Sequence, residues 1–185
     1  MKSWRLAVCV GLFAAVIGMS TVAADRKGPG ATVRRGEYLV TLGGCNDCHT
    51  PLKMGANGPE PDRSRLLSGH PQDLAMPPAP KLPPGPWMYT AAATMTAWAG
   101  PWGVSFTSNL TPDAETGLGK WTEQNFVESM RSGRHMGHGR SILPPMPYEA
   151  IAKMTDSDLK AVFAYLRSIP AVTNRVPDPI VPEPK

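Results

Sequence analysis

The sequence predicts an all-α domain built from three to five short helices and one long loop rich in proline and tryptophan. Two observations support this class. Apolar residues recur at helical spacing in segments on either side of residues 50–103, whereas that central stretch shows no lasting periodicity. Prolines within it also forbid a long helix. At 185 residues, the chain has the length of about one domain.

The first helix is expected from Thr32 to about Leu42. Thr32 is a suitable N-cap, and Tyr38 and Leu42 fall on one side of the helix at positions i and i+4. The Gly-Gly pair at 43–44 then ends the helix. The chain passes from there directly into a cysteine motif.

Three further helical segments are expected in the C-terminal half. Thr122 caps a helix with an apolar stripe that stops at Gly133. A short turn of helix is expected over 147–154. Thr155 caps the last helix, whose first turn has two aspartates near the positive end of the helix dipole, and Pro170 ends it.

The segment from residue 50 to 103 is predicted to be a long loop that packs onto the core. Six of the chain's 21 prolines lie between positions 77 and 86, and three of its five tryptophans, Trp87, Trp98 and Trp102, follow. A linker in solvent would not hold so many aromatic side chains, so contact between this loop and the core is expected.

Residues 45–49 read Cys-Asn-Asp-Cys-His and form a C-x-x-C-H motif. This spacing is typical of c-type haem attachment. The thiols of Cys45 and Cys48 are spaced to form thioethers with the two vinyl groups of one porphyrin, and the imidazole of His49 then ligates the iron from the proximal side. We therefore predict one covalent haem c, attached through both cysteines, with His49 as a ligand of the iron.

Two other interpretations of the cysteine pair stay open. A C-x-x-C pair can be half of a zinc site, which His135 and His138 would complete on spacing alone. It can also be a thiol redox pair, although the βαβ pattern expected around such a pair is not visible. The other cysteine, Cys9, lies in the N-terminal apolar segment.

The N-terminus has the pattern of a secretory signal peptide. Lys2 and Arg5 precede an apolar run over 6–19, and small residues at 22–24 offer a cleavage site. The alternative is an uncleaved membrane anchor, for which the run is barely long enough. Export agrees with the motif, since bacteria attach haem covalently outside the cytoplasm. The expected organisation is a signal peptide at 1–24, a flexible leader at 25–31, a domain at 32–172 and an extended Pro-rich tail at 173–185.

The charge of the chain argues against a nucleic-acid partner. Residues 1–24 contain Lys2 and Arg5 but no acid, so the rest of the chain has 17 basic and 15 acidic side chains, a net charge of +2. The longest basic cluster there is the pair Arg34-Arg35. Without a basic patch, there is no electrostatic basis for binding a polyanion.

Several segments together resemble a known family. The helix before C-x-x-C-H and the final helix at 155–167 are similar to those of class I cytochromes c. The more specific segments, at 105–113, 116–121 and 143–148, resemble a single haem module of the multihaem cytochrome c subunits of membrane-bound alcohol and aldehyde dehydrogenases.

The resemblance covers about residues 36–60 and 105–172, and it implies a cytochrome c fold around one haem. Those subunits have three modules where this chain has one C-x-x-C-H motif. The resemblance also marks about 75–103 as an insertion. Its aromatic residues are expected either to cap the haem pocket or to form a docking surface for a partner.

Met146 is the expected sixth ligand of the iron. It lies between prolines, which restrict the backbone, and it matches the position of the family's axial methionine. Met136 is the next candidate among the ten methionines. His135, His138 or His70 would instead give a bis-histidine haem, although each is more simply interpreted as an exposed loop histidine.

The resemblance further implies that Trp121 and Asn109 contact the haem, as a wall of its pocket and a partner of its propionates. With both axial positions filled by protein, it implies outer-sphere transfer of single electrons by a periplasmic carrier in a respiratory chain, and no catalytic residue. The expected partners are a dehydrogenase, an oxidase or another cytochrome, with peripheral membrane association through a partner. The alternative is a haem enzyme or sensor, a peroxidase or gas binder, whose sixth ligand dissociates.

Overall fold

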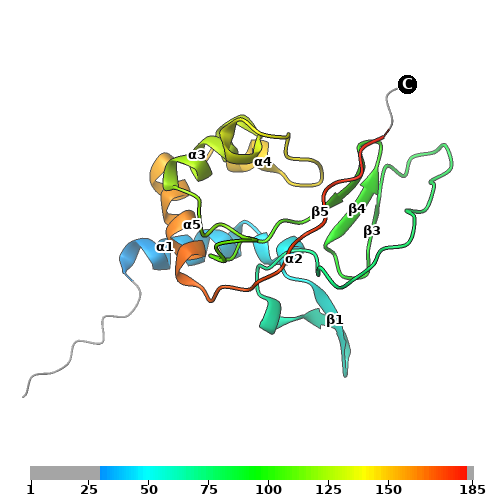
Figure 1. Ribbon diagram of the computed structural model, residues 1–185, viewed down its shortest axis with the longest axis horizontal. Helices are drawn as coiled ribbons and strands as arrows, with labels where there is room; N and C mark the ends of the chain where they lie inside the picture. The colour runs from blue at the N-terminus through cyan, green and yellow to red at the C-terminus, as the bar shows by residue number, and fades with distance from the viewer. Residues whose placement is uncertain (1–29, 183–185) are drawn as a thin grey trace, which may run out of the picture.

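The computed structural model of the protein describes residues 30–182 (Figure 1). Its five α-helices are α1 (Ala31–Leu42), α2 (Cys45–His49), α3 (Glu123–Ser132), α4 (Tyr148–Ile151) and α5 (Asp156–Ser168). Its strands are β1 (Leu52–Gly55), β2 (Gly58–Pro61), β3 (Thr90–Ala91), β4 (Ala97–Gly100) and β5 (Gly103–Phe106). Short 3₁₀ turns cover Arg63–Arg65 and His135–Gly137. The longer helices lie to one side, the β3-β4-β5 sheet lies to the other, and α2 lies between them.

The predicted all-α class is wrong, because residues 50–106 contain two antiparallel sheets. One is the hairpin β1-β2, and the other has the strand order β3-β4-β5. Both hairpins close with two-residue loops, at Gly55↔Gly58 and at Gly100↔Gly103. The turn signals were present, as Asn57-Gly58 and as Gly100-Pro101 followed by Gly103. The strands escape a periodicity test because each has four residues or fewer.

The helices predicted from caps and apolar spacing are confirmed. Thr122 forms a reciprocal capping box with Asn125, and Gly133 ends α3 in the left-handed conformation at φ 65°. The Thr155 hydroxyl accepts a hydrogen bond from the amide of Asp158 at the start of α5. The first helix begins two residues earlier than expected, with Gly30 rather than Thr32 at its N-cap.

The crossing of α1 over α5 forms the centre of the core. A Cβ atom at Gly36 would lie 1.9 Å from the carbonyl oxygen of Ala161, so only glycine permits the two backbones to approach this closely. Val40, Leu159 and Leu166 are fully buried around this contact. Phe126 of α3 packs on Phe163 of α5 with ring centroids 5.4 Å apart, which joins the third helix to the pair.

Residues 171–182, here called the C-terminal strap, run from α5 to the edge of the sheet (Figure 1). Asn174 is buried in the strap, and its side-chain amide donates to the carbonyl oxygens of Ser68 (2.7 Å) and His70 (2.8 Å). Farther along, Ile180 and Val104 exchange backbone hydrogen bonds of 2.7 and 2.9 Å. The strap is therefore tied to the sheet and to the loop before it.

The domain boundaries stay predictions. The expected signal peptide and most of the expected leader lie outside the described residues. Across residues 30–182, no helix combines the length and the apolar character needed to cross a bilayer.

Asp113 accepts a hydrogen bond from the C-terminal strap, and its contribution to stability depends on pH. Its carboxylate accepts hydrogen bonds from the hydroxyls of Thr116 (2.6 Å) and Thr173 (2.8 Å). These bonds lower the pKa of Asp113 from 3.8 to about 2, and the bond from Thr116 has the larger effect. Because the pKa is lower in the folded state than in the unfolded state, this stabilisation is present above pH 3.8 and is lost as pH falls through about 2.

Replacing Asp113 with asparagine is expected to make the stability of the protein fall less steeply as the pH is lowered into the acid range. The difference in urea midpoint between wild type and Asp113→Asn should be largest near neutral pH and should shrink as pH falls from 3.8 to about 2. Urea unfolding followed by circular dichroism across this range measures the difference. A difference that stays constant at every pH would contradict the proposed linkage.

Candidate functional site

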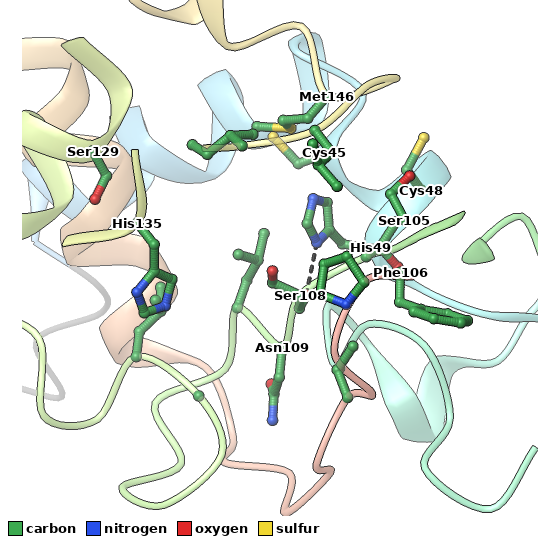
Figure 2. A pocket seen from close by; sticks show the side chains of 18 of the residues that line it. Cys45, Cys48, His49, Ser105, Phe106, Ser108, Asn109, Ser129, His135 and Met146 are labelled. Carbon is green, nitrogen blue, oxygen red and sulfur yellow. Dashed lines mark hydrogen bonds between the residues drawn. The ribbon is translucent and has the colours of Figure 1, made fainter. Parts of the chain in front are cut away.

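A single cavity of ≈ 470 Å³ brings together the predicted site residues (Figure 2). Its volume lies within the roughly 300–1,000 Å³ of small-molecule and cofactor sites. Its walls come from α2, the β4-β5 hairpin, α3, the loop before α4 and the C-terminal strap. All six site residues predicted from the sequence line it: Cys45, Cys48, His49, Asn109, Trp121 and Met146.

The C-x-x-C-H motif enters the cavity because it forms a helix of its own. Gly44, in the left-handed conformation at φ 63°, separates α1 from α2 and redirects the chain. Within α2, residues spaced i, i+3 and i+4 share one face, which places Cys45, Cys48 and His49 on the same wall. The predicted break at the Gly-Gly pair 43–44 therefore changes the direction of the chain so that the side chains of the motif face the cavity.

His49 is held in one tautomer. Its Nδ1 lies 2.8 Å from the carbonyl oxygen of Ser108 and must donate the hydrogen, since a carbonyl only accepts (Figure 2). The ring is buried, and burial lowers the pKa of His49 against the opposing effect of this hydrogen bond. The neutral ring therefore has its lone pair on Nε2, which is the form that ligates a metal.

The two thiols do not have the properties of a redox pair. Burial is the main cause that raises the pKa of both Cys45 and Cys48 above the usual value, whereas reactive C-x-x-C thiols have lowered pKa values. The zinc alternative also lacks a built site. Among residues 30–182, no group of three or more His, Cys, Asp or Glu side chains is arranged to hold a metal ion.

Met146 reaches the cavity from the loop between α3 and α4. Backbone hydrogen bonds link its amide to the carbonyl oxygen of Leu143 (3.3 Å) and its carbonyl oxygen to the amide of Tyr148 (2.9 Å). The loop is further attached to β5, because the Ser105 hydroxyl donates to the carbonyl oxygen of Pro144 at 2.6 Å. Figure 2 draws Met146, Cys45 and His49 among the side chains that line this cavity.

The other candidates for a sixth ligand are placed differently. Met136 does not line the cavity and has a left-handed backbone at φ 53°. His135 lines the cavity but packs edge-on against Trp121, with ring centroids 4.9 Å apart. His138 lies outside the lining. His70 is not an exposed loop histidine, as the sequence suggested, since it is fully buried and hydrogen-bonded to Thr96.

Asn109 has a structural role that the sequence did not indicate. Its amide nitrogen donates to the carbonyl oxygen of Val172 (2.8 Å) and to the hydroxyl of Thr116 (3.1 Å), while its oxygen accepts from the amide and hydroxyl of Thr111. These bonds hold the C-terminal strap beside the cavity. The predicted contact of Asn109 with a propionate stays a prediction, as does the role of Trp121.

The aromatic residues of the expected insertion differ in their exposure, and the two roles considered for the segment stay predictions. Trp98, on β4, is buried and lines the cavity. Trp87 is 78% exposed and lies outside the lining, and Met88 is 61% exposed. Tyr89 lies between these groups, with its ring centroid 5.9 Å from that of Trp98.

The cavity wall fits a bound porphyrin. In the described part of the chain, two buried side-chain atoms without a hydrogen-bond partner are Trp98 Nε1 and Ser129 Oγ, and both residues line the cavity. Buried donors nearly always have a partner, so a group with acceptor oxygens suits this wall. Arg140 and Arg175 also line the cavity, and their guanidinium groups suit carboxylates at the edge of such a ligand.

Comparisons with known proteins agree with the resemblance seen in the sequence, although no family model matches. The chain is 27% identical, over 96% of its length, to the cytochrome c subunit of a quinone alcohol dehydrogenase of Gluconobacter oxydans. It is 28% identical over 94% to the gluconate 2-dehydrogenase cytochrome c subunit of Pantoea cypripedii, and 27% identical over 73% to the fructose dehydrogenase cytochrome subunit of Gluconobacter japonicus.

The chain spans 30%, 32% and 21%, respectively, of the length of these three relatives. The match confirms the resemblance to one module of a cytochrome c subunit of such dehydrogenases.

Proposed function

We propose that the protein is a periplasmic monohaem c-type cytochrome, which passes single electrons between a donor dehydrogenase or respiratory complex and an acceptor such as a terminal oxidase. One observation supports this most strongly. Two cysteines, a histidine in its ligand tautomer and a proline-flanked methionine line the same cavity, although Met146 is about a hundred residues away from α2 in sequence.

Each residue has a defined task in this proposal. Cys45 and Cys48 hold the porphyrin through thioether bonds, and His49 and Met146 ligate its iron. The carbonyl oxygen of Ser108 keeps the His49 ring oriented through Nδ1. When bound, the haem supplies reversible one-electron chemistry.

With His49 and Met146 both bound to the iron, no coordination position would be left for a substrate. Leu118 and Phe126 belong to the hydrophobic core and also line the cavity, so the cofactor would form part of that core. A low-dielectric pocket and a thioether ligand both favour the reduced state, which raises the potential. With both axial positions taken, electrons enter and leave through the haem edge.

The relatives of the chain support its proposed partner, and its N-terminal sequence supports its proposed location. The three relatives described above are cytochrome subunits of dehydrogenases, which supports a dehydrogenase as the donor. The N-terminal pattern of positive, apolar and small residues supports export to the periplasm, and peripheral membrane association would come through a partner.

Anaerobic titration of the purified holoprotein tests the function. We expect one electron per chain on reduction, a low-spin spectrum in both oxidation states, and no change in the reduced spectrum when carbon monoxide is added. Rapid binding of carbon monoxide by the native reduced protein would instead support a haem enzyme or sensor with a dissociable ligand. Absence of any one-electron transition would contradict both functions.

A further inference from the structure

Ser105 connects the β3-β4-β5 sheet to the loop that contains Met146. It lies on β5, is 7% exposed and lines the cavity. Its hydroxyl donates to the carbonyl oxygen of Pro144 at 2.6 Å, across 39 residues of sequence. The accepting residue, Pro144, lies two positions before Met146 in the sequence.

The hydroxyl of Ser105 is itself oriented by a tryptophan. The Nε1 hydrogen of Trp102 is donated to Ser105 Oγ at 3.3 Å, so the hydroxyl is left to act as a donor. Of its two acceptors, the carbonyl oxygen of Pro144 at 2.6 Å is much nearer than that of Trp98 at 3.5 Å. Hydrogen bonds in such a chain strengthen one another. The Trp102 ring packs against Gly100, where an added Cβ atom would lie 2.6 Å from it.

The loop at 143–147 has few other means of being held in place. Prolines at 144, 145 and 147 have no amide hydrogen, so only two residues in this loop can donate from the backbone. Among the described residues, the Ser105 bond is the one hydrogen bond that ties this loop to a distant element. The prolines also limit the backbone between Pro144 and Met146, so fixing the Pro144 carbonyl restricts where the methionine sulfur lies.

We propose that Ser105 is a positioning residue for Met146: its hydrogen bond to Pro144 holds the methionine sulfur at the iron and so disfavours the state in which that ligand is detached. The proposal rests on the proposed function, because it requires that Met146 ligate a haem. It assigns to the expected insertion, through Trp102 and the β4-β5 hairpin, a part in setting the sixth ligand.

Binding of cyanide to the ferric holoprotein measures how often the methionine detaches, since cyanide takes the position it vacates. A net hydrogen bond of ordinary strength corresponds to roughly a tenfold change in such an equilibrium. Ser105→Ala should therefore bind cyanide roughly tenfold more tightly and show a weaker far-red charge-transfer band of methionine-ligated ferric haem. Ser105→Thr, which keeps the hydroxyl, should restore both properties. Trp102→Phe should shift both in the same direction by a smaller factor.

Ser68→Ala is the matched control. Ser68 is 1% exposed, donates a similar bond to the carbonyl oxygen of Arg65 at 2.9 Å, and does not line the cavity. It should lower the urea midpoint without changing cyanide affinity. The same substitution at two buried serines thus separates loss of stability from loss of the ligand's position.

Three outcomes would overturn the proposal, and they can be told apart. If the wild-type protein shows the far-red band and Ser105→Ala leaves it and cyanide affinity unchanged, the positioning role fails while the proposed function stands. If the wild type lacks the band, the ligand pair of the proposed function is wrong, and the positioning role falls with it. Should Ser105→Ala not fold, equal cyanide affinities in the wild type and Trp102→Phe would overturn the role.

Discussion

Met146→Ala is expected to turn a closed low-spin haem into one that binds carbon monoxide when reduced and cyanide when oxidised. The reason is that the loop at 143–147 offers no second sulfur and Met136 lies outside the cavity lining. Met130 lines the cavity, but it is a buried core residue of α3. Met146→His should keep a low-spin haem but lower the reduction potential markedly, within the roughly 0.8 V that axial ligands span in total. Optical spectra and a redox titration measure both effects.

Met154→Ala provides the control for these variants. Met154 is a partly buried methionine packed against the same core, but it does not line the cavity. It should lower stability and leave the spectrum unchanged. If Met146→Ala instead leaves spectrum and potential as they were, Met136 or one of the histidines is the ligand, and the proposed axial pair is wrong.

The double variant Cys45→Ser/Cys48→Ser is expected to lose its haem and most of its folded structure. Leu118, Phe126 and Met130 belong to the hydrophobic core and also line the cavity, so a bound haem would complete the packing on this side of the core. A covalently attached haem stays with the chain on unfolding, so it would stabilise the fold through the buried porphyrin surface and the iron ligands that only the folded chain brings together. Circular dichroism should therefore show reduced helix content and no cooperative melting.

Asp47→Asn, at an exposed position between the two cysteines, should keep haem, helix content and melting close to those of the wild type. The α1–α5 crossing at Gly36 is the part of the fold that would survive best without the cofactor, because it is close-packed on its own. Native helix content with cooperative melting in the double variant would contradict the idea that haem completes the core.

The sequence was sufficient where local chemistry determines the structure. Thr122, Gly133 and Thr155 end or begin helices through bonds to residues within four positions, so their roles can be read from a short segment. The C-x-x-C-H motif is equally local, since one short helix presents all of its functional groups to the cavity.

The sequence was insufficient where distant segments determine the structure. Short strands such as β4 and β5 form because they pair with each other, and a stretch rich in proline and glycine concealed them. Asn109 looked like a turn residue or a propionate partner, yet it anchors a strap about sixty residues away. His70 was expected at the surface, but it is buried by its contact with Thr96 on the strand side of the fold.

The same limit applied within the candidate site. Met146 could be proposed because prolines surround it and because it matches the family's position. Ser105 and Trp98 could not, because their importance comes from a hydrogen bond across 39 residues and from burial against the cavity. No sequence pattern indicates either property.

Mass spectrometry of the peptide containing residues 45–49, from protein denatured and digested under reducing conditions, tests the central claim most directly. The account predicts that this peptide retains the mass of one haem and that neither Cys45 nor Cys48 reacts with an alkylating reagent. Recovery of the peptide with two alkylated thiols, together with extraction of all haem into acidified acetone, would contradict covalent attachment and with it the assignment of the protein as a c-type cytochrome.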